Sequence, residues 1–399
     1  MENLFSVVVL CYRHFEYVYE AIDSVLEQDY PAIELIVSDD GSLNFPEKEI
    51  RNYVNKQKKQ NIVRFAVRHE KENCGTVKHL NRAIKACTGD YIIALAGDDV
   101  LADTNVLSTY KTGFMHAEDT CYIQMAQTGM YDEKLEKLET YYLKGTTQKA
   151  IEKTSETTQP LLKQLIIYGP CLPSTSTCFK REFFEKFGSF DEEYKLIEDY
   201  PMHFRLAKEG WIIHYENFVA IKHRHGGISH GQKGALTQSS VMYYKDLRRM
   251  IADIVMKNLD ILSHDEAEQV RNYRKKELQW IDFHLAKLNR KYGSILMIAL
   301  RNPFLSLRQA LEWAYPTANK MKKLLYVCCA LWLTIPDIER MISFVLMELG
   351  VETVGFIQPA LYLLSTGVFV VGAVAFLIWA ANNIMWRLER FPQESIVVG

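Results

Sequence analysis

Short runs of β-branched and apolar residues alternate with helical segments over the first hundred residues of the chain. Apolar positions recur at helical spacing over Tyr17–Glu27 and Thr76–Cys87, and a lysine-rich helical segment precedes the third run. The runs that indicate strands are Phe5–Leu10, Glu34–Val37, Arg64–Val67 and Tyr91–Ala96. Strands that alternate with helices of about a dozen residues predict βαβ units. The pattern therefore predicts an α/β fold around a mostly parallel sheet flanked by helices.

Two pairs of aspartates stand directly after predicted strands. Asp39-Asp40 follows the second strand, and Asp98-Asp99 follows the fourth. In parallel sheets, ligands bind beyond the carboxyl ends of the strands. Carboxylates there suit a divalent cation, which neutralises phosphate groups and takes oxygen ligands. Aspartate pairs also form turns and helix caps, so each pair taken alone leaves a structural role open.

Two later segments carry further chemistry. Glu198-Asp199 stands at the start of a predicted helix, where the anionic form of a carboxylate is favoured and suited to act as a general base. Helix capping is the alternative. The segment Lys222–Gly227 places cationic and imidazole groups beside glycines, which suits a diphosphate or a metal ion. A solvated loop is the alternative there.

The middle of the chain is less regular. Tyr131–Pro160 is polar, shows no sustained periodicity and predicts a long loop. Further strands and helices are predicted at Ser174–Phe179, Arg181–Phe187, Tyr200–Gly210 and Trp211–Tyr215, with Gly210 ending its helix.

The C-terminal part differs in composition from the rest. No charged residue occurs between Thr353 and Trp386, and Pro359–Ala381 supplies 23 residues for a transmembrane helix, which needs about 20. A buried core helix is the alternative. Between Lys245 and Lys323 there are 16 Lys or Arg residues and 9 Asp or Glu residues. This excess of positive charge is equally consistent with helices that rest on anionic lipid and with helices whose charged faces are solvated. We expect a catalytic domain at 1–235, a basic helical connector at 236–323, and membrane-associated helices at 324–399 with the span at 359–381.

Overall composition excludes some partners and sites. A net charge of −2 gives no global attraction to nucleic acid. The eight cysteines form no Cys-x-x-Cys pair, which argues against a zinc site and for reduced thiols in the cytosol.

Over residues 4–230 the chain resembles a glycosyltransferase family 2 enzyme with the GT-A fold, which has a Rossmann-like sheet. Single motifs are loose, but their order and spacing are specific. The matching motifs are Ser6–Tyr12, Glu34–Ser42, Asn73–Gly75, Asn81–Ile84, Ala94–Asp99, Phe187–Tyr194 with Glu198-Asp199, and His223–Ser229.

The resemblance implies roles for individual residues. Asp39 would contact the nucleotide base, Asp40 would lie near the ribose or metal, and Asp98 would contact the donor ribose or sugar. Asp99 would bind the metal, Mn²⁺ or Mg²⁺, with His225 as a further metal or phosphate contact. Asp199 would be the catalytic base, and Glu198 would orient it or bind the acceptor. The implied donor-binding set is completed by Cys11, Tyr12 and Arg224.

Three departures from the family pattern bear on these roles. Ala96 stands where many relatives carry another aspartate, so the metal ligand set is thinner. Arg13 replaces an asparagine often found after Tyr12 and changes the contacts expected near the base. No Gln-x-x-Arg-Trp motif follows Asp199, which favours transfer of one sugar per encounter over processive synthesis.

Together these features predict an inverting, metal-dependent glycosyltransferase that uses a nucleotide-sugar donor. We expect its catalytic domain on the cytoplasmic face of a membrane, a prokaryotic inner membrane, with a lipid-linked saccharide as acceptor in surface polysaccharide or glycolipid synthesis. Two alternatives stay open: a non-catalytic scaffold subunit and a nucleotidyltransferase. The second is less favoured, because a nucleotidyltransferase would need a glycine-rich loop after the first strand and this chain has none there. The apolar C-terminal helices can pair with copies of themselves, so a homo-oligomer also stays open.

Overall fold

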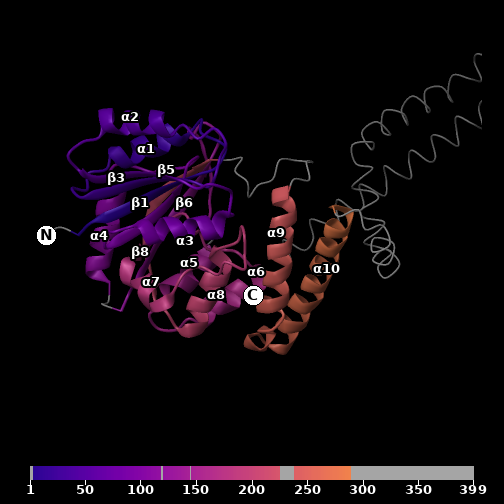
Figure 1. Ribbon diagram of the computed structural model, residues 1–399. Helices are drawn as coiled ribbons and strands as arrows, with labels where there is room; N and C mark the ends of the chain where they lie inside the picture. The colour runs from indigo at the N-terminus through magenta and orange to yellow at the C-terminus, as the bar shows by residue number, and fades with distance from the viewer. Residues whose placement is uncertain (1–2, 118–119, 144, 225–237, 289–399) are drawn as a thin grey trace, which may run out of the picture. The chain divides into compact units, whose positions relative to one another are not determined.

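A mixed β-sheet runs through the computed structural model of the chain (Figure 1). The structure describes residues 3–117, 120–143, 145–224 and 238–288. These residues belong to a unit that spans Met1–Arg290. The predicted membrane domain at 324–399, with its span at 359–381, and the end of the predicted connector lie outside the described residues. Within the described part of the chain, no helix is long and apolar enough to cross a membrane.

The N-terminal half of the sheet is parallel, as the sequence predicts. Its strand order is β3-β2-β1-β4, and the pairs β1–β2, β2–β3 and β1–β4 are all parallel. The four strands are β1 (Phe5–Cys11), β2 (Ile33–Asp39), β3 (Ile62–His69) and β4 (Tyr91–Ala96).

The second half of the sheet is mixed. It continues in the order β4-β8-β6-β9-β5, and β7 pairs with β6. The β6–β9 pair is parallel, whereas β4–β8, β6–β8, β5–β9 and β6–β7 are antiparallel. These strands are β5 (Val100–Leu101), β6 (Ile123–Tyr131), β7 (Leu138–Tyr141), β8 (Thr177–Lys180) and β9 (Ile213–Arg224).

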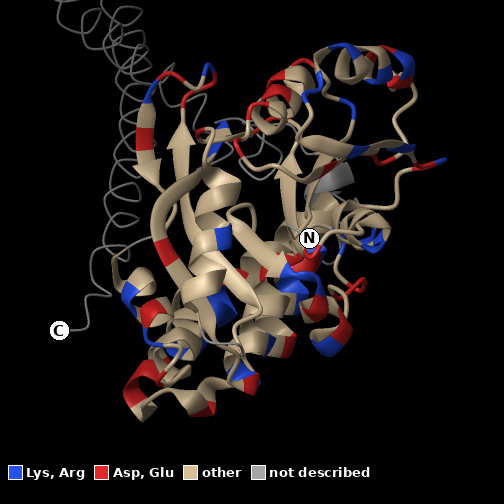
Figure 2. Ribbon diagram, turned by 90° about the vertical axis from the view of Figure 1, so that its left-hand side faces the viewer, with Lys and Arg blue, Asp and Glu red and all other residues tan. Residues whose placement is uncertain are grey.

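Helices cover both faces of the sheet because alternate side chains of each strand point to opposite faces. Val7 and Val9 belong to one buried cluster, whereas Val8 belongs to the other. The first cluster packs under α1 (Val18–Leu26), α2 (Glu47–Gln57) and α4 (Val106–His116). In Figure 2 most charged residues lie on helices and loops, and the central strands are largely uncharged.

The second cluster is larger and extends to the last described helices. It packs residues of α3, α5, α6, α7 and α8 against the sheet and includes Met250, Ile251 and Ile281. The helices on this side are α3 (Thr76–Ala86), α5 (Gly145–Glu152), α6 (Gln159–Tyr168), α7 (Arg181–Phe187), α8 (Asp199–Glu209), α9 (Gln238–Arg249) and α10 (His264–Leu288), with short helical turns at Met250–Val255 and Leu259–Ile261. The division into domains at residue 235 stays a prediction, although α9 and part of α10 share this core.

The long loop expected at Tyr131–Pro160 is wrong in part, because the segment holds β7, α5 and the start of α6. All four residues of β7 are exposed, so no alternation marks it as a strand. Helix α5 buries only Thr147, Ala150 and Ile151, a pattern too short to stand out in a polar segment. Pairing with β6 forms β7, and tertiary packing forms α5; hydrophobic periodicity reports neither.

Other local predictions are confirmed. Helix α7 has the predicted bounds, and α8 ends at Gly210, whose left-handed backbone (φ 80°) caps it. Strand β9 runs much further than Trp211–Tyr215, because its pairing with β6 continues to Arg224. The six described cysteines are free thiols.

The strand register brings the predicted acidic clusters to one edge of the sheet. Cys11 pairs with Asp39, and Leu10 pairs with Ala96, so β1, β2 and β4 end side by side. Asp39-Asp40 and Asp98-Asp99 therefore both leave the sheet at strand carboxyl ends, as the sequence predicts, on the two sides of β1.

Gly41 lets the turn after Asp40 pack against the following loop. Its φ is +76°, and a Cβ there would lie 2.3 Å from the backbone carbon of Glu72. We expect Gly41→Ala to lower the free energy of unfolding by at least about 2 kcal/mol. Thermal unfolding measures this effect. Gly145→Ala is the matched control, because its Cβ would meet no atom within 4 Å. Equal melting temperatures for the two variants would contradict the close approach.

Candidate active site

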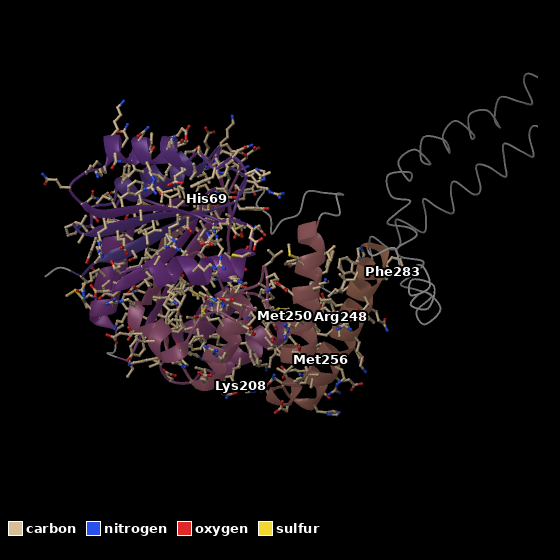
Figure 3. The ribbon with its side chains drawn as sticks, viewed as in Figure 1. His69, Lys208, Arg248, Met250, Met256 and Phe283 are labelled. Atoms are coloured by element: carbon tan, nitrogen blue, oxygen red, sulfur yellow. The ribbon has the colours of Figure 1, made fainter. Side chains whose placement is uncertain are left out.

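Asp39 is fully buried at the end of β2, and its carboxylate is bonded within the protein. The backbone N–H of Ser42 donates to Oδ2 (2.7 Å), and the Ser42 hydroxyl donates to Oδ1 (2.6 Å). His69 Nδ1, at the end of β3, lies 2.9 Å from Oδ2. The His69 ring stacks on Phe45 with centroids 5.3 Å apart. Asp39 therefore fixes His69, a residue that the sequence analysis missed and that Figure 3 labels beside the sheet.

Asp40 holds the loop that leads into α3. It accepts hydrogen bonds from the backbone N–H groups of Cys74 (2.9 Å) and Gly75 (3.1 Å) and from the side-chain amide of Asn73 (2.8 Å). Its own N–H donates to the carbonyl of Cys11 (3.0 Å). A buried carboxylate needs such donors to stay charged. Asp40 thus binds the Asn73–Gly75 motif to the strand ends.

Asp99 performs the same task on the other side of the edge. It is fully buried, with His223 Nδ1 2.9 Å from Oδ2 and the backbone N–H of Arg224 donating to Oδ1 (3.0 Å). The pKa of His223 is raised, because its bond to Asp99 and the charges of Asp99 and Asp98 outweigh burial, which acts to lower it. The two aspartates thus stabilise the charged form of the imidazole.

Asp98 differs from its neighbour. Its carboxyl is half-buried, and within the described residues no other residue donates a hydrogen bond to it. Burial and the charge of Asp99 raise its pKa above the ordinary aspartate value. Of the four aspartates at this edge, Asp98 is the one whose carboxylate is left available to a cation.

Arg224 is bound to protein acceptors throughout its guanidinium. Nε donates to the carbonyl of Asp98 (2.9 Å), Nη2 pairs with Glu20 (2.7 Å), and Nη1 donates to the carbonyl of Glu133. The group also lies 3.8 Å from the centroid of the Tyr17 ring. Through its bond to the Asp98 carbonyl, Arg224 connects the end of β9 to the segment that follows β4. Its predicted role in binding donor phosphate stays a prediction, and His225 lies outside the described residues.

The segment after β1 lies beside Asp39. The Cys11 side chain is buried, which raises the pKa of its thiol, so Cys11 joins the edge through its backbone. Arg13 has a left-handed backbone (φ 65°) and donates its N–H to the Ser42 hydroxyl (2.8 Å). Its guanidinium lies 4.7 Å from the centroid of the half-buried Tyr12 ring. Arg13 and Tyr12 thus form one polar surface next to the aspartates.

Glu198 and Asp199 stand at the N-terminus of α8, as the sequence predicts. The Ser174 hydroxyl donates to Glu198 Oε1 (3.2 Å), and the N–H of Tyr200 donates to Asp199 Oδ1 (2.7 Å). Burial raises the pKa of both carboxyls, and the charge of Asp199 raises that of Glu198 further. Two close carboxyls with raised pKa values suit proton transfer near neutral pH.

Three further residues lie close enough to Asp199 for its charge to act on them, although no sequence pattern pointed to them. Its charge adds to burial in raising the pKa values of Tyr142, Cys171 and Tyr243. They come from the segment after β7, the loop after α6, and α9. Only the tertiary fold brings them together around the carboxylate.

The donor set fits a divalent cation that is shared with a phosphate-bearing ligand. No group of three metal-ligating side chains occurs among the described residues. Magnesium and manganese sites for nucleotides often use one or two carboxylates, with phosphates and water as the other ligands. Asp98, available at the strand edge, meets that requirement.

Comparison with known proteins finds a family that matches the N-terminal part of the chain. Residues 6–158 match Glycosyl transferase family 2. An uncharacterized glycosyltransferase of Rickettsia typhi is 31% identical over 222 residues, which cover 55% of this chain and 64% of that protein. One of Haemophilus influenzae is 22% identical over 302 residues, covering 74% and 86%. The chain spans only 34% of a related Rickettsia felis glycosyltransferase.

Among solved structures, a mannosyltransferase from Pyrobaculum calidifontis in complex with GDP-Man and Mn²⁺ aligns with a TM-score of 0.46 and 15% identity, covering 77% of this chain and 83% of that one. S. aureus TarS 1–349 in complex with UDP-GlcNAc aligns with a TM-score of 0.43 and 15% identity, covering 75% and 92%. The family match spans β1 to α5 and includes both aspartate pairs of the strand edge. The chain therefore carries a glycosyltransferase family 2 domain.

Proposed function

We propose that the chain is an inverting, metal-dependent glycosyltransferase that moves one sugar from a nucleotide-sugar donor to an acceptor hydroxyl. The proposal rests on the presence of two separate sets of carboxyl groups. One is Asp98, whose carboxylate is available at the strand edge, and the other is Glu198 with Asp199 at the start of α8. The first suits the charge of a donor diphosphate. The second suits the proton of an acceptor hydroxyl.

The donor would lie over the ends of β1, β2 and β4. When bound, a divalent cation would neutralise the diphosphate and assist its departure as a Lewis acid. The family resemblance implies Asp99 as the metal ligand and Asp98 as a contact of the donor ribose or sugar. The two hydrogen bonds of Asp99 favour the reverse, so we propose Asp98 as the metal ligand and Asp99 as the residue that holds His223 and Arg224 in place.

Asp199 would act as the base. It takes the proton of the acceptor hydroxyl while that oxygen attacks the anomeric carbon, and the bond between this carbon and the diphosphate oxygen breaks with inversion. The α8 N-terminus favours the anion of Asp199. Glu198 would keep its own proton, because burial and the charge of Asp199 both raise its pKa. The pair then carries one negative charge, which makes Asp199 the base.

The proposed acceptor is a lipid-linked saccharide at the cytoplasmic face of a membrane. This part rests on the uncharged segment Thr353–Trp386, which lies outside the described residues. The absence of a Gln-x-x-Arg-Trp motif supports the transfer of single sugars.

A donor panel tests the proposal. UDP-, GDP-, dTDP- and CMP-sugars are titrated into the full chain with and without Mn²⁺, and binding and slow donor hydrolysis are both measured. We expect metal-dependent binding of one donor class. Asp199→Asn should retain the donor Kd and lose most of kcat, since only the base is removed. A folded chain that binds none of the donors would support a non-catalytic scaffold instead.

The two aspartates of the β4 edge should respond differently to removal of their charge. We expect Asp98→Asn to weaken metal-dependent donor binding at least about tenfold with little change in Tm, because no other described residue bonds to its carboxylate. Asp99→Asn should lower the free energy of unfolding by about 1–3 kcal/mol, because it disturbs the buried bonds to His223 and Arg224. Titration with Mn²⁺ and thermal unfolding measure both effects. A Tm loss confined to Asp98→Asn would contradict this division.

The Glu198 carboxyl should cost stability at high pH. Its folded pKa lies above the unfolded value, so between the two the folded state binds more protons, and its stability falls as the pH rises. Glu198→Gln should therefore raise the Tm relative to wild type at pH 8 and have much less effect at pH 4, where the carboxyl is mostly protonated in both states. A Tm difference independent of pH would contradict the raised pKa. Glu182→Gln, in the first turn of α7, is a control at a helix start.

A further inference from the structure

One carboxylate oxygen in α9 gathers three consecutive backbone amides. Asp246 Oδ2 accepts hydrogen bonds from the N–H groups of Lys195 (2.7 Å), Leu196 (2.7 Å) and Ile197 (3.3 Å). Asp246 is 4% exposed. Successive N–H groups that converge in this way form an anion-binding turn, and a charged acceptor makes each bond stronger than a neutral one would. The turn ends immediately before the pair Glu198–Asp199.

The opposite side of this turn is bound to the donor half of the site. The carbonyl of Lys195 accepts a hydrogen bond from the N–H of Val77 (3.3 Å). A Cβ on Gly75, whose N–H donates to Asp40, would lie 3.1 Å from that same carbonyl oxygen. The turn is therefore clamped between the loop that Asp40 holds and helix α9.

Other contacts hold α9 against the same segment. The Arg249 guanidinium pairs with the Glu193 carboxylate and lies 5.5 Å from the centroid of the Tyr194 ring. Met250 and Ile251, fully buried where α9 ends, belong to the same core as Tyr194 and Ile197. Figure 3 labels Met250 and Arg248 on this part of the chain, with Phe283 on the neighbouring α10. The contact between α9 and the turn is thus part of a packed core.

We propose that Asp246 is a positioning residue for the catalytic pair: by fixing the backbone of residues 195–197, it sets the direction in which Glu198 and Asp199 leave that turn. The inference rests on the proposed function of Asp199 as base. It makes α9, which lies after the residues matched by the family, a working part of the catalytic centre. An enzyme whose general base is misplaced by about 1 Å can lose much of its catalytic rate, so the backbone that positions Asp199 should affect kcat.

The test compares variants of α9 in the full chain. Asp246→Ala removes the acceptor, Asp246→Asn keeps an oxygen acceptor, and Arg248→Ala breaks a contact of the same helix with Asp282 of α10 (2.6 Å) without touching the turn. Hydrogen exchange reports the amides of residues 195–197. The kcat and donor Kd are measured by hydrolysis of the nucleotide sugar that the wild type uses in the donor panel with Mn²⁺.

We expect Asp246→Ala to speed exchange of these amides and to lower kcat about tenfold or more, with the donor Kd within twofold of wild type. Asp246→Asn, which keeps an oxygen acceptor without the charge, should lower kcat and speed exchange less than Asp246→Ala does, and Arg248→Ala should leave kcat and the exchange of residues 195–197 unchanged. If Asp246→Ala fails to fold, faster exchange and a reduced kcat in Asp246→Asn, set against Arg248→Ala, still support the role.

The positioning role would be overturned by faster exchange with an unchanged kcat, or by parallel losses of kcat and donor affinity in Asp246→Ala and Arg248→Ala alike. Unchanged exchange in Asp246→Ala would remove its structural basis. Wild-type chain that turns over no donor would instead refute the proposed function, and with it this role of the turn. Wild-type turnover that Asp246→Ala preserves would refute only the positioning role.

Discussion

The structure depends on how buried carboxylates are satisfied at one edge of the sheet. Asp39, Asp40 and Asp99 are almost wholly removed from water, which is costly for a charge without partners. Each is bonded to a side chain distant in sequence. His69, at the end of β3, is 30 residues from Asp39, Asn73 is 33 residues from Asp40, and His223, in β9, is 124 residues from Asp99. The strand ends, the loop before α3 and the end of β9 are held together by these bonds.

This arrangement separates carboxylates that hold the site from those left for chemistry. The bonded aspartates already accept hydrogen bonds, whereas no other described residue donates to the Asp98 carboxylate, and the Glu198–Asp199 pair has raised pKa values. A carboxyl whose pKa is raised by folding lowers the stability of the folded chain at neutral pH, and a carboxyl with a purely structural role gives no reason for that loss. The destabilised groups are therefore the ones we assign to the metal and to the proton.

Much of this edge could be predicted from the sequence. Dense β-branched runs mark β1 to β4, and parallel topology then places Asp39 and Asp98 at the same edge of the sheet. The acidic helix start at Asp199 was equally visible. The hydrogen bonds were not, because partners such as His69 and His223 have no periodic relation to the aspartates they bind. The elements β7 and α5 were missed for a related reason: β7 has no buried position and is formed by its pairing with β6, and the three buried positions of α5 are too few to show a helical period. Asp246 could not be singled out, since one aspartate in a basic helix resembles a solvated surface residue.

The central claim is that the separate aspartate motifs form one donor site with the loop before α3. Hydrogen exchange of the wild-type chain, with and without the donor it binds and Mn²⁺, tests this claim most directly. The account predicts added protection in residues 39–42, 73–75 and 97–99 together, dependent on the metal, with no change in the solvent-facing part of α10. Protection confined to another surface would contradict this claim, as would protection that is independent of the metal and absent from the strand ends.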